Sequence, residues 1–139
     1  MDTAFDFHPT VYYNKLSDEF AGFHTDSVNV LFHLVTTPLG LVGTVSLINA
    51  YTKSWSFVVA ALCIYLISLL PAVPNGVFIG TSLFCGVITL AAKELRLTLV
   101  SSVMLIILGY ILQDLAHMGT GEKTFQSSYS AGGDVRCFA

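Results

Sequence analysis

Four long apolar runs, separated by short polar breaks, constrain this chain more than any other feature of its sequence. Between residues 27 and 113 only four side chains carry a charge: Lys53, Lys93, Glu94 and Arg96. Charged residues make up 11% of the whole chain, against about a quarter in an average soluble domain. The mean hydropathy is +0.72. Such a chain is expected in a lipid bilayer, because in water much of the apolar surface of these runs would stay exposed.

At a rise of about 1.5 Å per residue, each run covers roughly the hydrocarbon core as a helix. The runs predict transmembrane helices over 28–50, 55–73, 76–92 and 97–116. Residues 10–24 carry aromatic and charged side chains on opposite sides at helical spacing, which predicts an amphipathic helix at the membrane surface. The Gly- and Ser-rich tail, 118–139, is predicted to be loop. We therefore expect one all-α membrane domain spanning 1–139: a four-helix bundle with an N-terminal interfacial helix.

Several classes of protein are excluded by what the sequence lacks. It contains no basic run of the kind that binds nucleic acid, no glycine-rich phosphate loop and no nucleophile elbow. The first residues lack the basic-then-apolar layout of a cleavable signal, so the first span is expected to direct its own insertion. The charges beside the spans leave the orientation in the membrane open.

Three of the four histidines lie at the ends of apolar runs. His24 and His33 bracket the entry to the first run, and His117 closes the last. An even number of spans returns the chain to the same face of the membrane, which brings these residues together at one end of the bundle. A break at residues 26–27, where Asp26 or Ser27 can cap the first span, lets His24 fold back over the start of that helix.

Polar side chains accompany two of these histidines at one helical turn. Asn29 shares a helix face with His33, and Gln113 shares one with His117, with Asp114 beside it. Imidazoles bind transition metals, and carboxamides and carboxylates commonly orient metal-bound imidazoles. The sequence therefore predicts a metal site with His24, His33 and His117 as ligands.

Plainer roles remain open for the same residues. A histidine at a helix end is often an interfacial residue with one wet edge, and for His24 alone this role is as reasonable as ligation. Asn29 and Gln113 can each hydrogen-bond a neighbouring helix. Asp114 either orients His117 or stays neutral. His33 and His117 together, each with a polar residue one turn away, favour a site.

Two pieces of the chain carry a resemblance to a known family. They are His24-x4-Asn29-x3-His33-x4-Pro38 and, three spans later, Leu112-Gln113-x3-His117 followed by a glutamate. This pattern, with the span count and spacing over about residues 10–125, resembles the endoplasmic-reticulum 2-hydroxy fatty acid dioxygenases of the yeast type. The chain departs from the family pattern around His117: Ala116 replaces the usual glycine, and Glu122 follows five residues later.

The resemblance implies an Fe(II) enzyme of fatty-acid α-oxidation in the endoplasmic-reticulum membrane, which uses dioxygen to shorten a long-chain 2-hydroxy fatty acid by one carbon. It implies iron bound by the three histidines, with Asn29 and Gln113 supporting the metal site. Glu122 and Asp114 are the candidates for moving protons. The alternative from a different class is a non-catalytic membrane scaffold or lipid-binding protein, whose histidines only link helices and which binds no metal.

Overall fold

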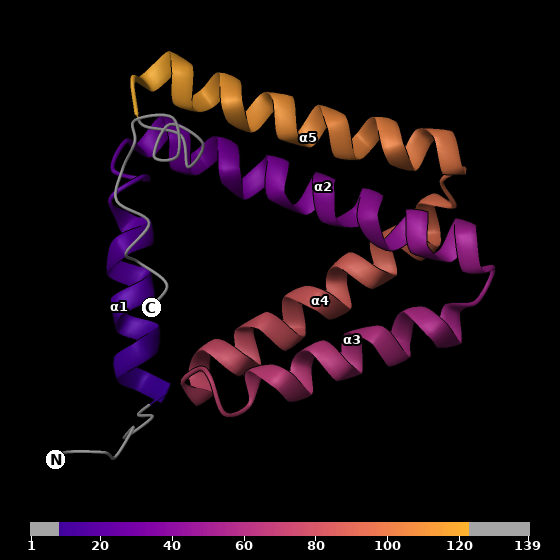
Figure 1. Ribbon diagram of the computed structural model, residues 1–139. Coiled ribbons are helices and arrows are strands. Elements are labelled where there is room, and N and C mark those ends of the chain that lie inside the picture. Colours follow the sequence, from indigo (N-terminus) through magenta and orange to yellow (C-terminus); the bar gives the residue numbers. More distant parts are fainter. Residues whose placement is uncertain (1–8, 123–139) are drawn as a thin grey trace, which may run out of the picture.

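A computed structural model describes residues 9–122, and this part of the chain is all-α. It contains five helices and no strand (Figure 1). They are α1 (Pro9–Ala21), α2 (Ser27–Thr52), α3 (Trp55–Leu69), α4 (Asn75–Leu95) and α5 (Leu99–Thr120). The predicted amphipathic helix and the four apolar helices all form. The first three residues of the predicted tail, 118–120, belong to α5, and residues 123–139 lie outside the described part.

The second apolar helix, α3, is shorter than the sequence predicted. It has 15 residues and ends at Leu69, whereas the predicted span ran from 55 to 73. Pro71 and Pro74 explain the difference, because proline removes a helical N–H and disfavours helical backbone in the residue before it. Within residues 9–122, three helices (α2, α4 and α5) are long and apolar enough to cross a membrane, not four.

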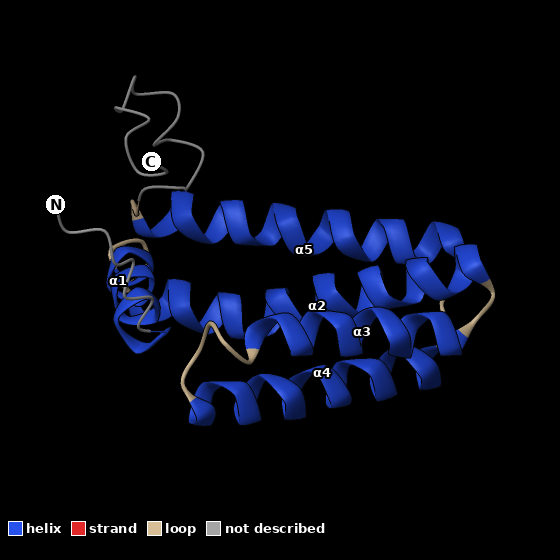
Figure 2. Ribbon diagram, turned by 60° about the horizontal axis from the view of Figure 1, so that its bottom comes forward, coloured by secondary structure: helices blue, strands red, loops and turns tan. Residues whose placement is uncertain are grey.

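The closest packing in the molecule joins α2 to α5, which lie side by side in both ribbon views (Figures 1 and 2). Two glycines make it possible. A Cβ atom on Gly43 would lie 2.9 Å from the carbonyl oxygen of Ser102, and one on Gly109 would lie 3.1 Å from the carbonyl oxygen of Thr36. Small residues let membrane helices approach closely, since lipid provides no hydrophobic force to press them together. Pro38 lies inside α2, which continues through it without a break.

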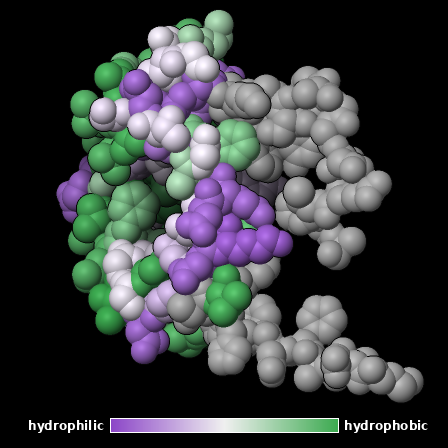
Figure 3. All heavy atoms as spheres, turned by 90° about the vertical axis from the view of Figure 1, so that its left-hand side faces the viewer, coloured by the Kyte–Doolittle hydropathy of each residue, from purple (hydrophilic) through white to green (hydrophobic). Residues whose placement is uncertain are grey.

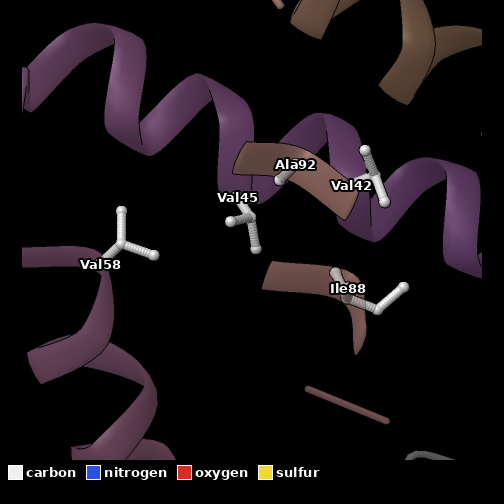
Figure 4. Packing of buried hydrophobic residues seen from close by; sticks show 5 residues of the cluster. All are labelled: Val42, Val45, Val58, Ile88 and Ala92. Atoms are coloured by element: carbon white, nitrogen blue, oxygen red, sulfur yellow. The ribbon is translucent and has the colours of Figure 1, made fainter. Parts of the chain in front are cut away.

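Helices α3 and α4 form a hairpin that packs against the second half of α2. The contact is a small apolar cluster, shown in Figure 4, whose members come from all three helices: Val42, Val45, Val58, Ile88 and Ala92. Away from this cluster the hairpin diverges from the α2–α5 pair, and α4 makes no close backbone contact with α5 (Figure 1). The predicted four-helix bundle is therefore confirmed only in part: α2 packs against α3, α4 and α5, and α3 against α4, but the hairpin does not pack against α5. The small residues that permit close approach are concentrated between α2 and α5.

Helix α1 runs across the end of the α2–α5 pair rather than along it (Figure 1). Its apolar residues Leu16 and Phe20 are exposed, as are its charged residues Lys15, Asp18 and Glu19. Figure 3 looks onto this end, where hydrophilic side chains gather in a patch bordered by hydrophobic ones. If α2 and α5 cross the membrane, a helix across their ends lies in the plane of the membrane surface, as expected of an interfacial helix.

Candidate metal centre

Three imidazoles converge at the end of the molecule where α2 begins and α5 ends. One ligand nitrogen from each of His24, His33 and His117 lies within 4.8 Å of the other two. His117 is buried, and the other two are partly buried. They are the one group of three or more metal-binding side chains found within residues 9–122. The structure therefore brings together the three histidines that the sequence singled out.

His24 is held by the turn that links α1 to α2. Its ring stacks on Phe20 with the ring centroids 4.3 Å apart, and its Nδ1 lies 3.1 Å from the carbonyl oxygen of Phe20. A carbonyl can only accept, so Nδ1 carries the proton and Nε2 keeps a free lone pair. Nε2 of His24 is buried and has no hydrogen-bond partner within the described chain. A buried lone pair without a donor suits a metal ion.

The break before α2 that folds His24 back is fixed by an N-cap. The carboxylate of Asp26 accepts hydrogen bonds from the backbone N–H groups of Val28, at 2.7 Å, and Asn29, at 3.3 Å. These donors have no partner inside the helix, which is why aspartate is favoured at this position. Of the two predicted caps, Asp26 and Ser27, the structure selects Asp26.

His33 and His117 face each other from α2 and α5, with their Nε2 atoms 3.0 Å apart. Metal–imidazole bonds are about 2.1 Å long, so two ligands at 90° would have nitrogens about 3.0 Å apart and two tetrahedral ligands about 3.4 Å apart. The observed separation matches two neighbouring corners of an octahedron. It also equals an ordinary hydrogen bond, in which one Nε2 donates to the other.

Asn29 is fully buried beside His117. Its Nδ2 lies 3.2 Å from Nδ1 of His117 and 3.3 Å from the carbonyl oxygen of Phe23, and it also donates to Oε2 of Glu122. Its Oδ1 is buried without a partner in the described chain. The Asn29 Nδ2 only donates, so it bonds His117 when Nδ1 of His117 carries no proton, and the proton of a neutral His117 then lies on Nε2, facing His33. Metal ligation through Nε2 of His117 requires that proton on Nδ1, in which case Nδ2 of Asn29 donates only to Glu122 and Phe23.

Glu122 follows the end of α5 and reaches across to the turn before α2. Its Oε1 accepts hydrogen bonds from the Thr25 N–H at 2.5 Å, the Thr25 hydroxyl at 2.6 Å and the Asp26 N–H at 2.8 Å. The Thr25 hydroxyl, followed by the Asp26 N–H, the Asn29 amide and the Thr25 N–H, lowers the pKa of Glu122 to about 2, while partial burial acts in the opposite direction. Glu122 is therefore a carboxylate at every physiological pH.

The remaining two predicted site residues lie outside the cluster of imidazoles. Gln113 donates from Nε2 to the hydroxyl of Thr37 at 2.9 Å, and so bridges α5 to α2 instead of contacting a histidine. Asp114 is partly buried within α5, and its side chain contacts none of the three histidines through a hydrogen bond. Sequence reasoning missed Thr25 and the carbonyl of Phe20. The predicted break after His24 was a usable signal for both, because a chain that folds back there leaves backbone N–H and C=O groups of the turn free to bond side chains.

The donor set fits a divalent first-row transition metal. Neutral imidazoles bind iron, zinc, copper and nickel, and His24 already offers a lone pair with no other use. The Nδ1 contact of His24 with a backbone carbonyl is the kind of outer interaction that orients a metal-bound histidine. Three imidazole ligands to a six-coordinate ion would leave three positions for other ligands. Such a set fits Fe(II) without selecting it over its neighbours.

Comparison of the chain with protein families, with curated proteins and with solved structures found no match.

Proposed function

We propose that this chain is a membrane-embedded Fe(II) dioxygenase that shortens a long-chain 2-hydroxy fatty acid by one carbon, at the endoplasmic reticulum if the cell is eukaryotic. The observation that carries the proposal is the convergence of three imidazoles, His24, His33 and His117, of which His24 has a buried Nε2 without a partner in the described chain. The choice of iron, of substrate and of compartment rests on the sequence resemblance. The three apolar helices support an integral membrane protein.

The proposed reaction balances with dioxygen as the only co-substrate. R–CH(OH)–COOH and O₂ give R–COOH, CO₂ and H₂O: the bond between carbons 1 and 2 breaks, carbon 2 is oxidised to the new carboxyl, and dioxygen is reduced. A bound ferrous ion supplies dioxygen activation and a docking point for the hydroxyl and carboxylate of the substrate. His24, His33 and His117 hold the ion. Asp114, at the rim one turn from His117, remains the predicted proton carrier.

A groove between α2 and α5 offers a place for the acyl chain. It has a volume of about 210 Å³ and begins one helical turn below His33 and His117, at Thr37 and Gln113. Its lining comprises Thr36, Thr37, Gly40, Leu41, Thr44, Ile106, Gly109, Tyr110 and Gln113. The hydroxyls of Thr36 and Thr44 donate to carbonyl groups of their own helix, which turns these residues into apolar lining. A lipid tail in this groove would place its polar head at the histidines.

Four membrane crossings remain part of the proposal although α3 is short. Helices α2, α4 and α5 are each long enough to cross, and the turn at Lys53–Ser54 lies at the end opposite the histidines. If α2 and α4 cross in the same direction, α3 must carry the chain back between them. The apolar residues Leu70 and Val73 extend its 15 residues toward the membrane surface.

The test measures bound iron and turnover in the same preparations. Wild-type chain purified anaerobically with Fe(II) should hold one iron per chain and convert 2-hydroxypalmitate to the acid one carbon shorter. His24→Ala, His33→Ala and His117→Ala should each lose the iron and the turnover. His8→Ala should retain both, because the proposed ligand set does not include His8, the fourth histidine of the sequence. Full turnover in iron-free protein, or in the His33→Ala variant, would refute the proposal.

A second candidate is a non-catalytic lipid-binding or scaffold protein. The 3.0 Å contact between His33 and His117 favours it, because one proton shared by two imidazoles also explains that distance. In that case wild-type protein holds no stoichiometric metal, and the His→Ala variants lose only stability.

A further inference from the structure

The end of α5 is built so that the chain turns back toward α2. Gly121 has a φ of +70°, a conformation that glycine adopts without strain, and its N–H donates to the carbonyl oxygen of His117. The N–H of Glu122 bonds the same carbonyl at 3.1 Å. These two hydrogen bonds to the same carbonyl oxygen reverse the chain directly after the helical turn that carries His117. This reversal sets the side chain of Glu122 over the start of α2.

At that position the carboxylate meets donors from Thr25 and Asp26, in the α1–α2 connection, and from Asn29, in the first turn of α2. Oε1 accepts from the N–H and hydroxyl of Thr25 and from the N–H of Asp26, and Oε2 accepts from the Asn29 side chain. Thr25 is the residue after His24, and Asn29 contacts His117. Each oxygen of Glu122 therefore leads, through one residue, to a different imidazole of the candidate metal centre.

We propose that Glu122 is a positioning residue, a carboxylate latch that holds the turn carrying His24 against the end of α5 carrying His117. The latch rests on the proposed function in one respect, since its purpose is to set the distance between two ligands of one metal ion. It replaces the role of proton carrier that the sequence suggested for Glu122.

Two properties of the carboxylate separate a latch from a proton carrier. A general base works best with a pKa near the operating pH, whereas hydrogen bonds hold the pKa of Glu122 at about 2. Its oxygens are also already engaged by four donors, so a substrate proton would have to displace one of them. A negative charge at the start of α2 is in addition favoured by the helix dipole.

The latch predicts a defect in metal binding rather than in chemistry. Glu122→Gln exchanges one acceptor oxygen for an NH₂ group that faces donors, and Glu122→Asp keeps the charge but is one methylene too short to reach. In both variants, the Fe(II) dissociation constant should rise by about 10- to 100-fold, as it does when groups that orient metal ligands are lost. Turnover should return toward the wild-type kcat in excess Fe(II). Glu94→Gln is the matched control, because Glu94 is exposed near the end of α4, away from the histidines.

The test combines Fe(II) titration, kcat at saturating Fe(II), and amide hydrogen exchange at Thr25 and Asp26 in the metal-free full-length chain. Faster exchange together with weaker Fe(II) binding supports the latch. Unchanged exchange overturns it, and so does an unchanged dissociation constant with a kcat reduced by about 10²–10⁴, the loss expected of a general acid–base group. If wild type binds no iron, the proposed function fails, while the exchange rates at Thr25 and Asp26 still decide whether the latch exists.

Discussion

Gly109→Ala is the substitution that most directly tests whether α2–α5 packing sets the metal centre. A Cβ atom at this position would lie 3.1 Å from the carbonyl oxygen of Thr36, 3.2 Å from the nitrogen of Gly40 and 3.3 Å from its Cα. Ordinary contact begins at 3.4 Å, so α5 must move away by at least 3.4 − 3.1 = 0.3 Å. All three atoms are backbone, and no side-chain rotation relieves the contact. Thr36 is three residues from His33, so the displacement acts almost directly on the site.

Gly40→Ala supplies the matched control. A Cβ atom there would meet nothing within 4 Å, although Gly40 lies in the same helix contact. Both variants change glycine to alanine inside a helix and gain about the same helix propensity, roughly 1 kcal/mol. The difference in their free energies of unfolding therefore isolates the steric contact, and overpacking of this kind costs about 1–3 kcal/mol.

The same free energy should appear in metal binding. If α5 relieves the contact by moving away from α2, a metal that needs His33 and His117 at their present 3.0 Å must press the helices together again. A cost of about 1–3 kcal/mol corresponds to a dissociation constant about 5- to 150-fold higher in Gly109→Ala than in Gly40→Ala. Isothermal titration with Fe(II) and denaturant unfolding in detergent measure the two quantities. Equal stability and equal affinity in the two variants would refute the view that this helix contact sets the site.

Three further predictions concern the turn after α5, the latch and the surface helix. Gly121→Ala should destabilise the protein by about 1–2 kcal/mol in thermal or denaturant unfolding, because an alanine at φ +70° is strained; unchanged stability would contradict the assigned turn. The folded pKa of Glu122, about 2, lies below its ordinary 4.5, so its stabilising effect is complete above pH about 4.5 and is lost as the pH falls through about 2. Amide exchange at Thr25, corrected for its intrinsic pH dependence, should therefore show constant protection from pH 8 to 5 and a loss only below that, and a loss near pH 6 would be inconsistent with this pKa. Spin labels at Asn14 and Asp18 should report water or headgroups, and a hydrocarbon environment at both would show that α1 is not a surface helix.

The sequence predicted the elements well because their signals are local. The apolar runs and the Asp26 cap located α2 within two residues at each end. The meeting of His33 and His117 followed from the number of runs, since each run reverses the chain. Even the shortening of α3 had a local signal in Pro71 and Pro74, although the run of apolar residues continued past it.

What the sequence could not predict depends on contacts between distant residues. Gln113 shares a helix face with His117, yet whether it bonds a histidine or Thr37 depends on the rotation of α5 against α2. Glu122 and Thr25 lie outside the helices, so no helix face places them together. Their contact arises from the left-handed turn at Gly121. The divergence of the α3–α4 hairpin likewise depends on which glycines face a neighbouring helix: Gly43 and Gly109 do, whereas a Cβ atom on Gly80 or Gly86 of α4 would meet nothing within 4 Å.

The partners at the site are separated by most of the chain: 84 residues between His33 and His117, and 97 between Thr25 and Glu122. During synthesis α2 is made before α5. Three further helices must therefore be made before His117 can reach His24 and His33. Contacts this distant in sequence are slow to form, because the intervening loop must be closed first. The α3–α4 hairpin shortens that search by returning the chain beside α2. If the three histidines hold a metal ion as proposed, its loading is therefore a late event in biogenesis, and nascent chains arrested before residue 117 should retain no ion.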